Sequence, residues 1–206
     1  MPDIPLPDIL SLGFDTSAAH CAAALLQGDR VLAQHHEDMA RGQAERLFPL
    51  LGELLAGAGV EWHQLGVIGC GTGPGNFTGI RISVAAARGL ALSLSIPAIG
   101  VSVTEATACG LPRPCRVMVP ARPAGVIWQD FGADLTGGSA SQPRQDLPED
   151  LPPGPAAAQP VMPLAEGIAR IALARRLEPG LPRPTPIYLR PADAAPARDR
   201  GPVMLP

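Results

Sequence analysis

A glycine-rich corner, GTGPGNFTGIRI, extends from Gly71 to Ile82 and constrains the fold of this chain more than any other segment. It follows an apolar run, Leu65 to Cys70, that we interpret as a short buried strand, and it precedes an alanine-rich stretch, Ser83 to Leu94, that predicts a helix. Glycine at such a corner permits positive φ and close approach of a neighbour or ligand. Free N–H groups at the helix start favour anions, whereas a tight structural turn is the alternative interpretation.

The corner lacks both standard nucleotide motifs. A P-loop ends in Gly-Lys-Ser/Thr, and the chain contains no lysine. The dinucleotide fingerprint needs GxGxxG, whereas Gly71-Thr72-Gly73 is followed here by Pro74-Gly75-Asn76. The corner is therefore distinctive without being a generic nucleotide loop.

Length and charge limit the classes of function. A chain of 206 residues can form one domain or two small lobes. A net charge of -3 argues against a protein that binds nucleic acid alone, because phosphate binding needs a basic surface. The four cysteines show no CxxC spacing, which disfavours zinc ribbons. Because no apolar run reaches about 18 residues and the N-terminus is acidic, we expect a cytoplasmic protein without a membrane span.

Apolar patterning predicts a mixed α/β sheet with helices on its faces. The predicted strands are 9–14, 19–26, 30–36, 65–70 and 96–101, and the predicted helices are 41–58, 83–94 and 103–109. A hairpin turn is expected at Gln27-Gly28-Asp29. The helix over 41–58 carries a broad leucine stripe, and Gly79, Ser83 and Ala87 give the next helix a small face. These faces either pack on the sheet or, in part, meet a partner.

The chain changes character near residue 111, since 19 of its 25 prolines follow that point. We predict paired strands over 116–119 and 125–131, a flexible or disordered loop over 142–163, and a helix over 162–177. An extended segment over 187–190 and a frayed tail from 192 follow. We therefore divide the chain into a first lobe, 1–110, and a smaller second lobe, 111–206, with a proline-rich loop and a C-terminal tail.

The triplet Asp15-Thr16-Ser17 ends the first predicted strand. A carboxylate with two hydroxyls at a strand end can hold a metal-bound phosphate, and an Asx or Ser/Thr turn is the structural alternative. The segment 134–139 resembles a second phosphate loop in outline, but a hairpin turn explains it more simply.

The histidines form no site by spacing. His35 and His36 are adjacent on a predicted strand and point to opposite faces, while His20 and His63 are isolated. No His, Cys or Glu cluster has metal-ligand spacing, and neither a GxSxG elbow nor an HExxH helix is present. We expect no catalytic residue and no metal.

Five segments together resemble the TsaB family, also called YeaZ, a bacterial subunit of the machinery that makes threonylcarbamoyladenosine in tRNA. They are ILSLGFDTSAAHCAAALL (Ile9–Leu26), RGQAERLFPLLGELL (Arg41–Leu55), GTGPGNFTGIRISVAAARGLAL (Gly71–Leu92), IPAIGVSVTEATA (Ile96–Ala108) and PIYLRP (Pro186–Pro191). The most specific is GPGNFTGIRI, which is similar to the family's GPGSFTGLRIG block. The resemblance covers nearly the whole first half in order.

The resemblance implies an α/β, actin-like ATPase fold (ASKHA, ribonuclease H-like) with two lobes, here with a shortened second lobe. It also implies a non-catalytic scaffold that forms a heterodimer with TsaD through its first two helices, while TsaD carries the metal and transfers the threonylcarbamoyl group. The ATPase TsaE joins that pair, and tRNA is bound only through the complex. Older naming called such proteins peptidases.

The sequence departs from the family in three places. The family often has histidine where Gln43 stands, and its DARRGE-like segment is PARPAGV here, Pro120 to Val126, with neither carboxylate. The second lobe is shortened through 139–160. These departures fit a scaffold better than an enzyme.

The resemblance then suggests where each role lies. The expected partner interface comprises Arg41, Leu47, Leu50, Leu51, Leu54, Phe77, Ile80, Arg81, Val84 and Arg88. Asp15, Thr16 and Ser17 are the candidates for nucleotide binding, with no intrinsic cofactor and ATP only at the interface of the complex. We expect a homodimer when TsaD is absent. The alternative functions are an active ATPase or phosphotransferase of the same fold, or an M22-type peptidase.

Overall fold

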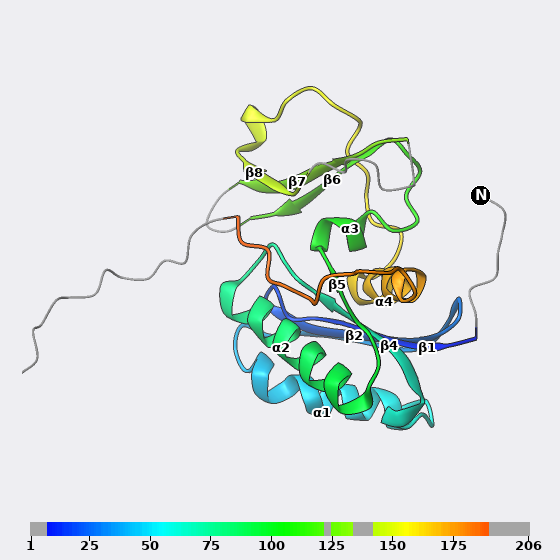
Figure 1. Cartoon of the computed structure of the whole chain (residues 1–206). Helices are drawn as coiled ribbons and strands as arrows, with labels where there is room; N and C mark the ends of the chain where they lie inside the picture. The colour runs from blue at the N-terminus through cyan, green and yellow to red at the C-terminus, as the bar shows by residue number, and fades with distance from the viewer. Residues whose placement is uncertain (1–7, 122–124, 134–141, 190–206) are drawn as a thin grey trace, which may run out of the picture.

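The computed structural model describes residues 8–121, 125–133 and 142–189, and its main element is a five-stranded sheet in the order β3-β2-β1-β4-β5 (Figure 1). The strands are β1 (Leu10–Asp15), β2 (His20–Gln27), β3 (Arg30–Asp38), β4 (Leu65–Gly71) and β5 (Ala98–Val101). The first three form an antiparallel meander, and β4 and β5 add in parallel to β1. The predicted strands and the hairpin turn near Gly28 are therefore confirmed.

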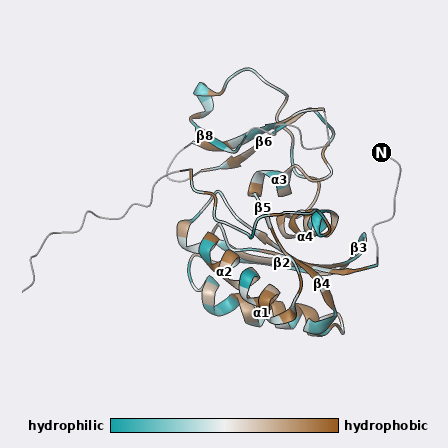
Figure 2. Ribbon diagram, in the orientation of Figure 1, coloured by the Kyte–Doolittle hydropathy of each residue, from teal (hydrophilic) through white to brown (hydrophobic). Residues whose placement is uncertain are grey.

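Helices cover both faces of this sheet. The helices α1 (Gln43–Gly57) and α2 (Phe77–Leu94) lie on one face, and α4 (Leu164–Arg175) lies on the other (Figure 1). Side chains alternate along β1, so Leu12 and Phe14 join the core beneath α1 and α2. Figure 2 shows hydrophobic residues along the central strands and alternating hydrophobic and hydrophilic patches on α1 and α2, as expected of helices with one buried face.

The packing of α4 depends on a glycine in β1. A Cβ atom on Gly13 would overlap the carbonyl oxygen of Ala165 and would lie 2.6 Å from the backbone nitrogen of Ala169. The helix therefore approaches the sheet more closely than any larger residue would allow. This segment comes from the C-terminal part of the chain and covers the first sheet, and the division of the chain at residue 110 stays a prediction.

The glycine corner leads directly into α2. The helix begins at Phe77 and not at Ser83, because the side chain of Asn76 caps it by accepting hydrogen bonds from the N–H groups of Thr78 and Gly79, each 3.0 Å long. By length and composition α2 could also cross a membrane. One third of that window is buried inside the structure, including Ile80 and Val84 in the core against the sheet.

A second, antiparallel sheet contains β6 (Cys115–Pro120), β7 (Val126–Phe131) and β8 (Arg144–Asp146). The short helix α3 (Val103–Thr107) contacts β6 and β7 as well as α4. The predicted pairing of β6 with β7 is confirmed. The prediction that 142–163 is a flexible or disordered loop is wrong in part, since β8 and a 3₁₀ turn, η2 (Pro148–Asp150), lie within it. A further 3₁₀ turn, η1 (Trp62–Gln64), precedes β4.

A buried arginine holds the proline-rich segment in place. The guanidinium of Arg116 donates to both carboxylate oxygens of Asp130, at 2.6 and 2.7 Å, and to the carbonyl oxygen of Pro152 at 2.7 Å. Charge-assisted contacts of this kind order a segment that its composition alone leaves undefined. The segment 134–139 and the tail from Ala192 lie outside the described residues, as does Arg190 at the end of the predicted extended segment.

Candidate functional site

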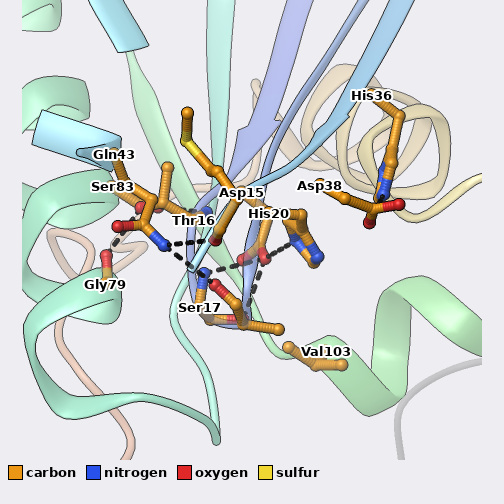
Figure 3. A network of polar contacts seen from close by, with 12 residues as sticks. Asp15, Thr16, Ser17, His20, His36, Asp38, Gln43, Gly79, Ser83 and Val103 are labelled. Atoms are coloured by element: carbon orange, nitrogen blue, oxygen red, sulfur yellow. Dashed lines mark hydrogen bonds and ion pairs between the residues drawn. The ribbon is translucent and has the colours of Figure 1, made fainter. Parts of the chain in front are cut away.

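The turn after β1 is closed by its own side chains (Figure 3). The Oδ1 atom of Asp15 accepts hydrogen bonds from the backbone N–H of Ser17 at 2.9 Å and from the Ser17 hydroxyl at 2.8 Å. Asp15, Thr16 and Ser17 are all at least 98% buried, with exposures of 0, 0 and 2%. These contacts support the Asx turn that the sequence left open as the alternative to a phosphate loop.

Thr16 attaches this turn to α2. Its N–H donates to the hydroxyl of Ser83 at 2.9 Å, and its own hydroxyl donates to the carbonyl oxygen of Gly79 at 2.7 Å. A Cβ atom on Gly79 would overlap the carbonyl oxygen of Thr16 and would lie 3.0 Å from the carbonyl carbon. The small face of α2 thus brings the helix onto the turn, and Thr16 donates both of its protons to α2.

A histidine completes the cluster at the turn. The Nε2 atom of His20 lies 2.7 Å from Asp15 Oδ1, and the His20 ring lies 5.0 Å from the ring of His36, whose Nε2 is 3.2 Å from Asp38 Oδ1 (Figure 3). The interpretation of His20 as isolated is therefore wrong. In the register of β2 and β3, Ala22 pairs with His36, so His20, two residues before Ala22, lies diagonally across from His36. Sequence spacing alone does not give this cross-strand distance.

The cluster joins a carboxylate to an imidazole but does not form a nucleophilic site. Oδ2 of Asp15 has no hydrogen-bond partner among the described residues. The Ser17 hydroxyl donates to the same Asp15 oxygen that faces His20, so the described contacts join no serine to an imidazole. A Ser-His-Asp relay needs the imidazole between the other two groups. The arrangement orients the turn and contains no activated hydroxyl.

Six residues expected at the partner interface are buried inside this chain. Their exposures are 0, 1, 0, 7, 0 and 4% for Leu47, Leu50, Leu51, Leu54, Ile80 and Val84. All six belong to the core between α1, α2 and the sheet. The expectation that their side chains meet a partner is wrong, because the stripe of each helix that is richest in apolar residues faces the sheet.

The other expected interface residues lie at the surface. Arg41, Arg81 and Arg88 are exposed, and Phe77 is half-buried. The Phe77 ring lies 4.9 Å from the ring of Tyr188, and the Arg81 guanidinium lies 3.8 Å above the Phe77 ring. Their contact with a partner stays a prediction. Tyr188 was missed as a member of this surface, although it lies in the PIYLRP segment that supported the family resemblance.

Cys21 and Cys70 are buried thiols that burial keeps protonated. Burial raises the pKa of the Cys21 thiol to about 11 and that of the Cys70 thiol to about 12. In the described parts of the chain, no group of three or more His, Cys, Asp or Glu residues is placed to hold a metal ion. That the protein carries no metal stays a prediction, which elemental analysis after chelator-free purification tests.

The strand order and directions define the class of protein. An antiparallel β1-β2-β3 meander extended in parallel by β4 and β5, with helices on both faces, is the actin-like ATPase fold, ASKHA or ribonuclease H-like. A family model described as TsaD, tRNA N6-adenosine threonylcarbamoyltransferase, matches residues 31–138.

Comparison with individual proteins narrows this class. The chain is 34% identical over 131 residues to the tRNA threonylcarbamoyladenosine biosynthesis protein TsaB of Escherichia coli, covering 61% of this chain and 56% of that protein. The solved structure of YeaZ from Pseudomonas aeruginosa has a TM-score of 0.63 and 30% identity, with 81% of this chain and 90% of that chain covered. A second solved structure, of a protein similar to peptidase YEAZ from Pseudomonas aeruginosa, has a TM-score of 0.71 and 27% identity, with 88% and 100% covered.

These matches assign the chain to the TsaB (YeaZ) family. The chain spans about half the length of the curated TsaB relatives from Escherichia coli and Haemophilus influenzae.

Proposed function

We propose that this chain supports threonylcarbamoyladenosine modification of tRNA as a non-catalytic scaffold that pairs with a TsaD-type subunit. The names of its relatives place TsaB proteins in that biosynthesis. The observation that carries the scaffold role is the closed turn after β1. A phosphate-binding turn needs donors directed at the ligand, whereas those of Thr16 are directed at α2 and that of the Ser17 hydroxyl at Asp15.

Two alternative functions need parts that the described residues do not assemble. An ATPase or phosphotransferase needs free phosphate donors and a positioned acid or base, and calorimetric titration of the isolated chain with ATP tests this directly. A peptidase of the M22 type needs a metal site, or otherwise an activated nucleophile. Gln43, where the family often has histidine, donates instead to the carbonyl oxygen of Met39 at 3.1 Å. A protease assay on casein tests this second alternative.

In the proposed complex, the outer sides of α1 and α2 contact the TsaD-type subunit, a TsaE-type ATPase joins the pair, and tRNA is held through the assembly. The chain is cytoplasmic in this proposal, and ATP binds only at the interface of the complex. The isolated chain pairs with a second copy through the same face, because exposed apolar groups there, such as Phe48 at 47% exposure, gain about 25 cal/mol per Å² when buried.

A matched pair of substitutions tests the face. Ala85 is exposed on α2, and Ala174 is exposed on α4 on the opposite side of the sheet. We expect Ala85→Arg to weaken binding to the purified TsaD-type subunit of the same organism, since it adds a long charged side chain to the contact, while Ala174→Arg binds as the wild type does. Binding is measured by calorimetry. Equal affinities for both variants would place the contact elsewhere, and absence of wild-type binding would end the proposal.

A further inference from the structure

The exposed side of α2 is cationic, and no described residue supplies a carboxylate partner for it. The helix contains Arg81 and Arg88 and no acidic residue, in a chain of net charge -3. Neither arginine lies within ion-pair distance of a carboxylate in the described residues. Other arginines of the chain do make such pairs, namely Arg46, Arg116, Arg170 and Arg175. Among the described residues, the two guanidiniums of α2 therefore have no acidic partner.

Arg81 is also held in one orientation. Its guanidinium carbon lies 3.8 Å above the centre of the Phe77 ring, and its Nε donates to the Tyr188 hydroxyl at 2.9 Å. Its two terminal nitrogens make no hydrogen bond to the described residues. A guanidinium anchored through Nε presents those nitrogens as a planar fork that matches a carboxylate in two parallel hydrogen bonds. Fixing the fork beforehand reduces the entropy lost on binding.

The segment after α4 that carries Tyr188, the residue that holds Arg81, is itself fixed to the glycine corner. The N–H of Ile187 donates to the carbonyl oxygen of Thr72 at 2.8 Å, and Arg88 donates to the Thr185 hydroxyl at 3.4 Å. In Figure 1 this segment, coloured orange to red, leaves α4 and runs toward the start of α2. Tyr188 is thereby held beside α2 with 42% of its surface exposed.

The neighbouring residues favour a protein over a nucleic acid as the ligand. Ala85 lies exposed between the two arginines, and the same side of the helix ends at Leu92, which is 84% exposed. An RNA backbone needs a denser run of cations, because binding strength rises with the number of phosphates neutralised. Aromatic and arginine side chains beside apolar ones are typical of the contact centre between proteins.

We propose that Arg81 and Arg88 bind two carboxylates on the TsaD-type partner, and that Tyr188 is a positioning residue for Arg81. This inference rests on the proposed function. Arg88 lies seven positions after Arg81 on the helix, a rise of about 10 Å, so the partner's carboxylates lie about 10 Å apart. The described part of the C-terminal PIYLRP segment, residues 186–189, thus belongs to the docking face, although it is more than 90 residues from α2 in the sequence.

Three variants and one control test this site in the full chain. Arg81→Ala removes the fork, Arg88→Ala removes the second cation, and Tyr188→Phe keeps the aromatic ring but removes the hydroxyl that orients Arg81. Arg30→Ala is the control, because it removes one positive charge just as Arg81→Ala and Arg88→Ala do. Arg30 is exposed at the β2–β3 hairpin, and its side chain bonds only to Gln27 among the described residues. Affinity for the purified TsaD-type subunit is measured by calorimetry at low and high salt, with thermal unfolding of each variant alone.

We expect Arg81→Ala to raise Kd by about 10- to 100-fold and Tyr188→Phe by about 3-fold. Arg88→Ala is expected to raise Kd by about 5-fold. In all three variants the affinity should depend less on salt than in the wild type, while the melting temperatures stay near that of the wild type. Unchanged affinity of Arg81→Ala would overturn the carboxylate site and leave the proposed function standing. So would a loss confined to tRNA binding by the assembled complex, which would identify an RNA phosphate as the ligand. Absence of wild-type binding would overturn both.

Discussion

Substitution of Gly79 by alanine tests how α2 is set against the turn. The added Cβ would overlap the carbonyl oxygen of Thr16, a backbone atom that cannot rotate away. Overpacking costs about 2 kcal/mol, and loss of the two hydrogen bonds that Thr16 donates to α2 costs about 1 kcal/mol each. Alanine regains about 1 kcal/mol through helix propensity. We therefore expect Gly79→Ala to lower the free energy of unfolding by about 3 kcal/mol, and the melting temperature by about 10 °C.

Gly89 provides a matched control on the same helix. A Cβ atom there meets no heavy atom within 4 Å, so Gly89→Ala should gain stability by up to about 1 kcal/mol. Urea titration of the isolated chain, followed by circular dichroism, measures both variants. If the midpoints of the two variants agree within error, the close approach of α2 to the turn is not what sets the helix.

Three further outcomes follow from burial and charge. Leu51→Arg should abolish the cooperative thermal transition in circular dichroism, because an unpaired charge in this core costs several kcal/mol; a wild-type melt would show that the side chain is not in the core. Hydrogen bonds from Arg46 hold the Glu37 pKa at about 2, below its ordinary 4.5. The stabilisation from this pair is therefore present above pH 4.5 and is lost as pH falls toward 2. The urea midpoint should fall more between pH 5 and pH 3 in the wild type than in Glu37→Gln, and an equal fall in both would contradict this. Cys21 and Cys70 should resist a thiol reagent at pH 8 until urea is added, and peptide mapping that finds either labelled in the native protein would refute their burial.

Local patterns were sufficient to predict most of the fold. The continuous apolar run of β2 and the Gly28 turn predict the hairpin, and the apolar run before Gly71 predicts β4. The start of α2 was misplaced because Asn76 was not considered as a cap, although asparagine is a strong N-terminal signal. The packing of α4 onto the first sheet could not be predicted from local patterns, since it depends on a contact between Gly13 and a helix about 150 residues later.

The site was harder to predict than the fold, because its contacts link distant segments. A leucine stripe shows that a helix buries one side, but it does not show whether the sheet or a partner covers it. The structure assigns Leu51 and its neighbours to the sheet. The pairing of His20 with Asp15 depends on the hairpin register, and that of Arg81 with Tyr188 joins segments 107 residues apart.

Reconstituted tRNA modification tests the central claim most directly. The purified TsaD-type and TsaE-type subunits of the same organism would be supplied with an activated threonylcarbamoyl donor, ATP and unmodified tRNA, and threonylcarbamoyladenosine would be measured by mass spectrometry of the digested tRNA. We predict modification only when this chain is present, restoration by Ala174→Arg but not by Ala85→Arg, and none with this chain alone. Equal modification with and without the chain would contradict the scaffold role.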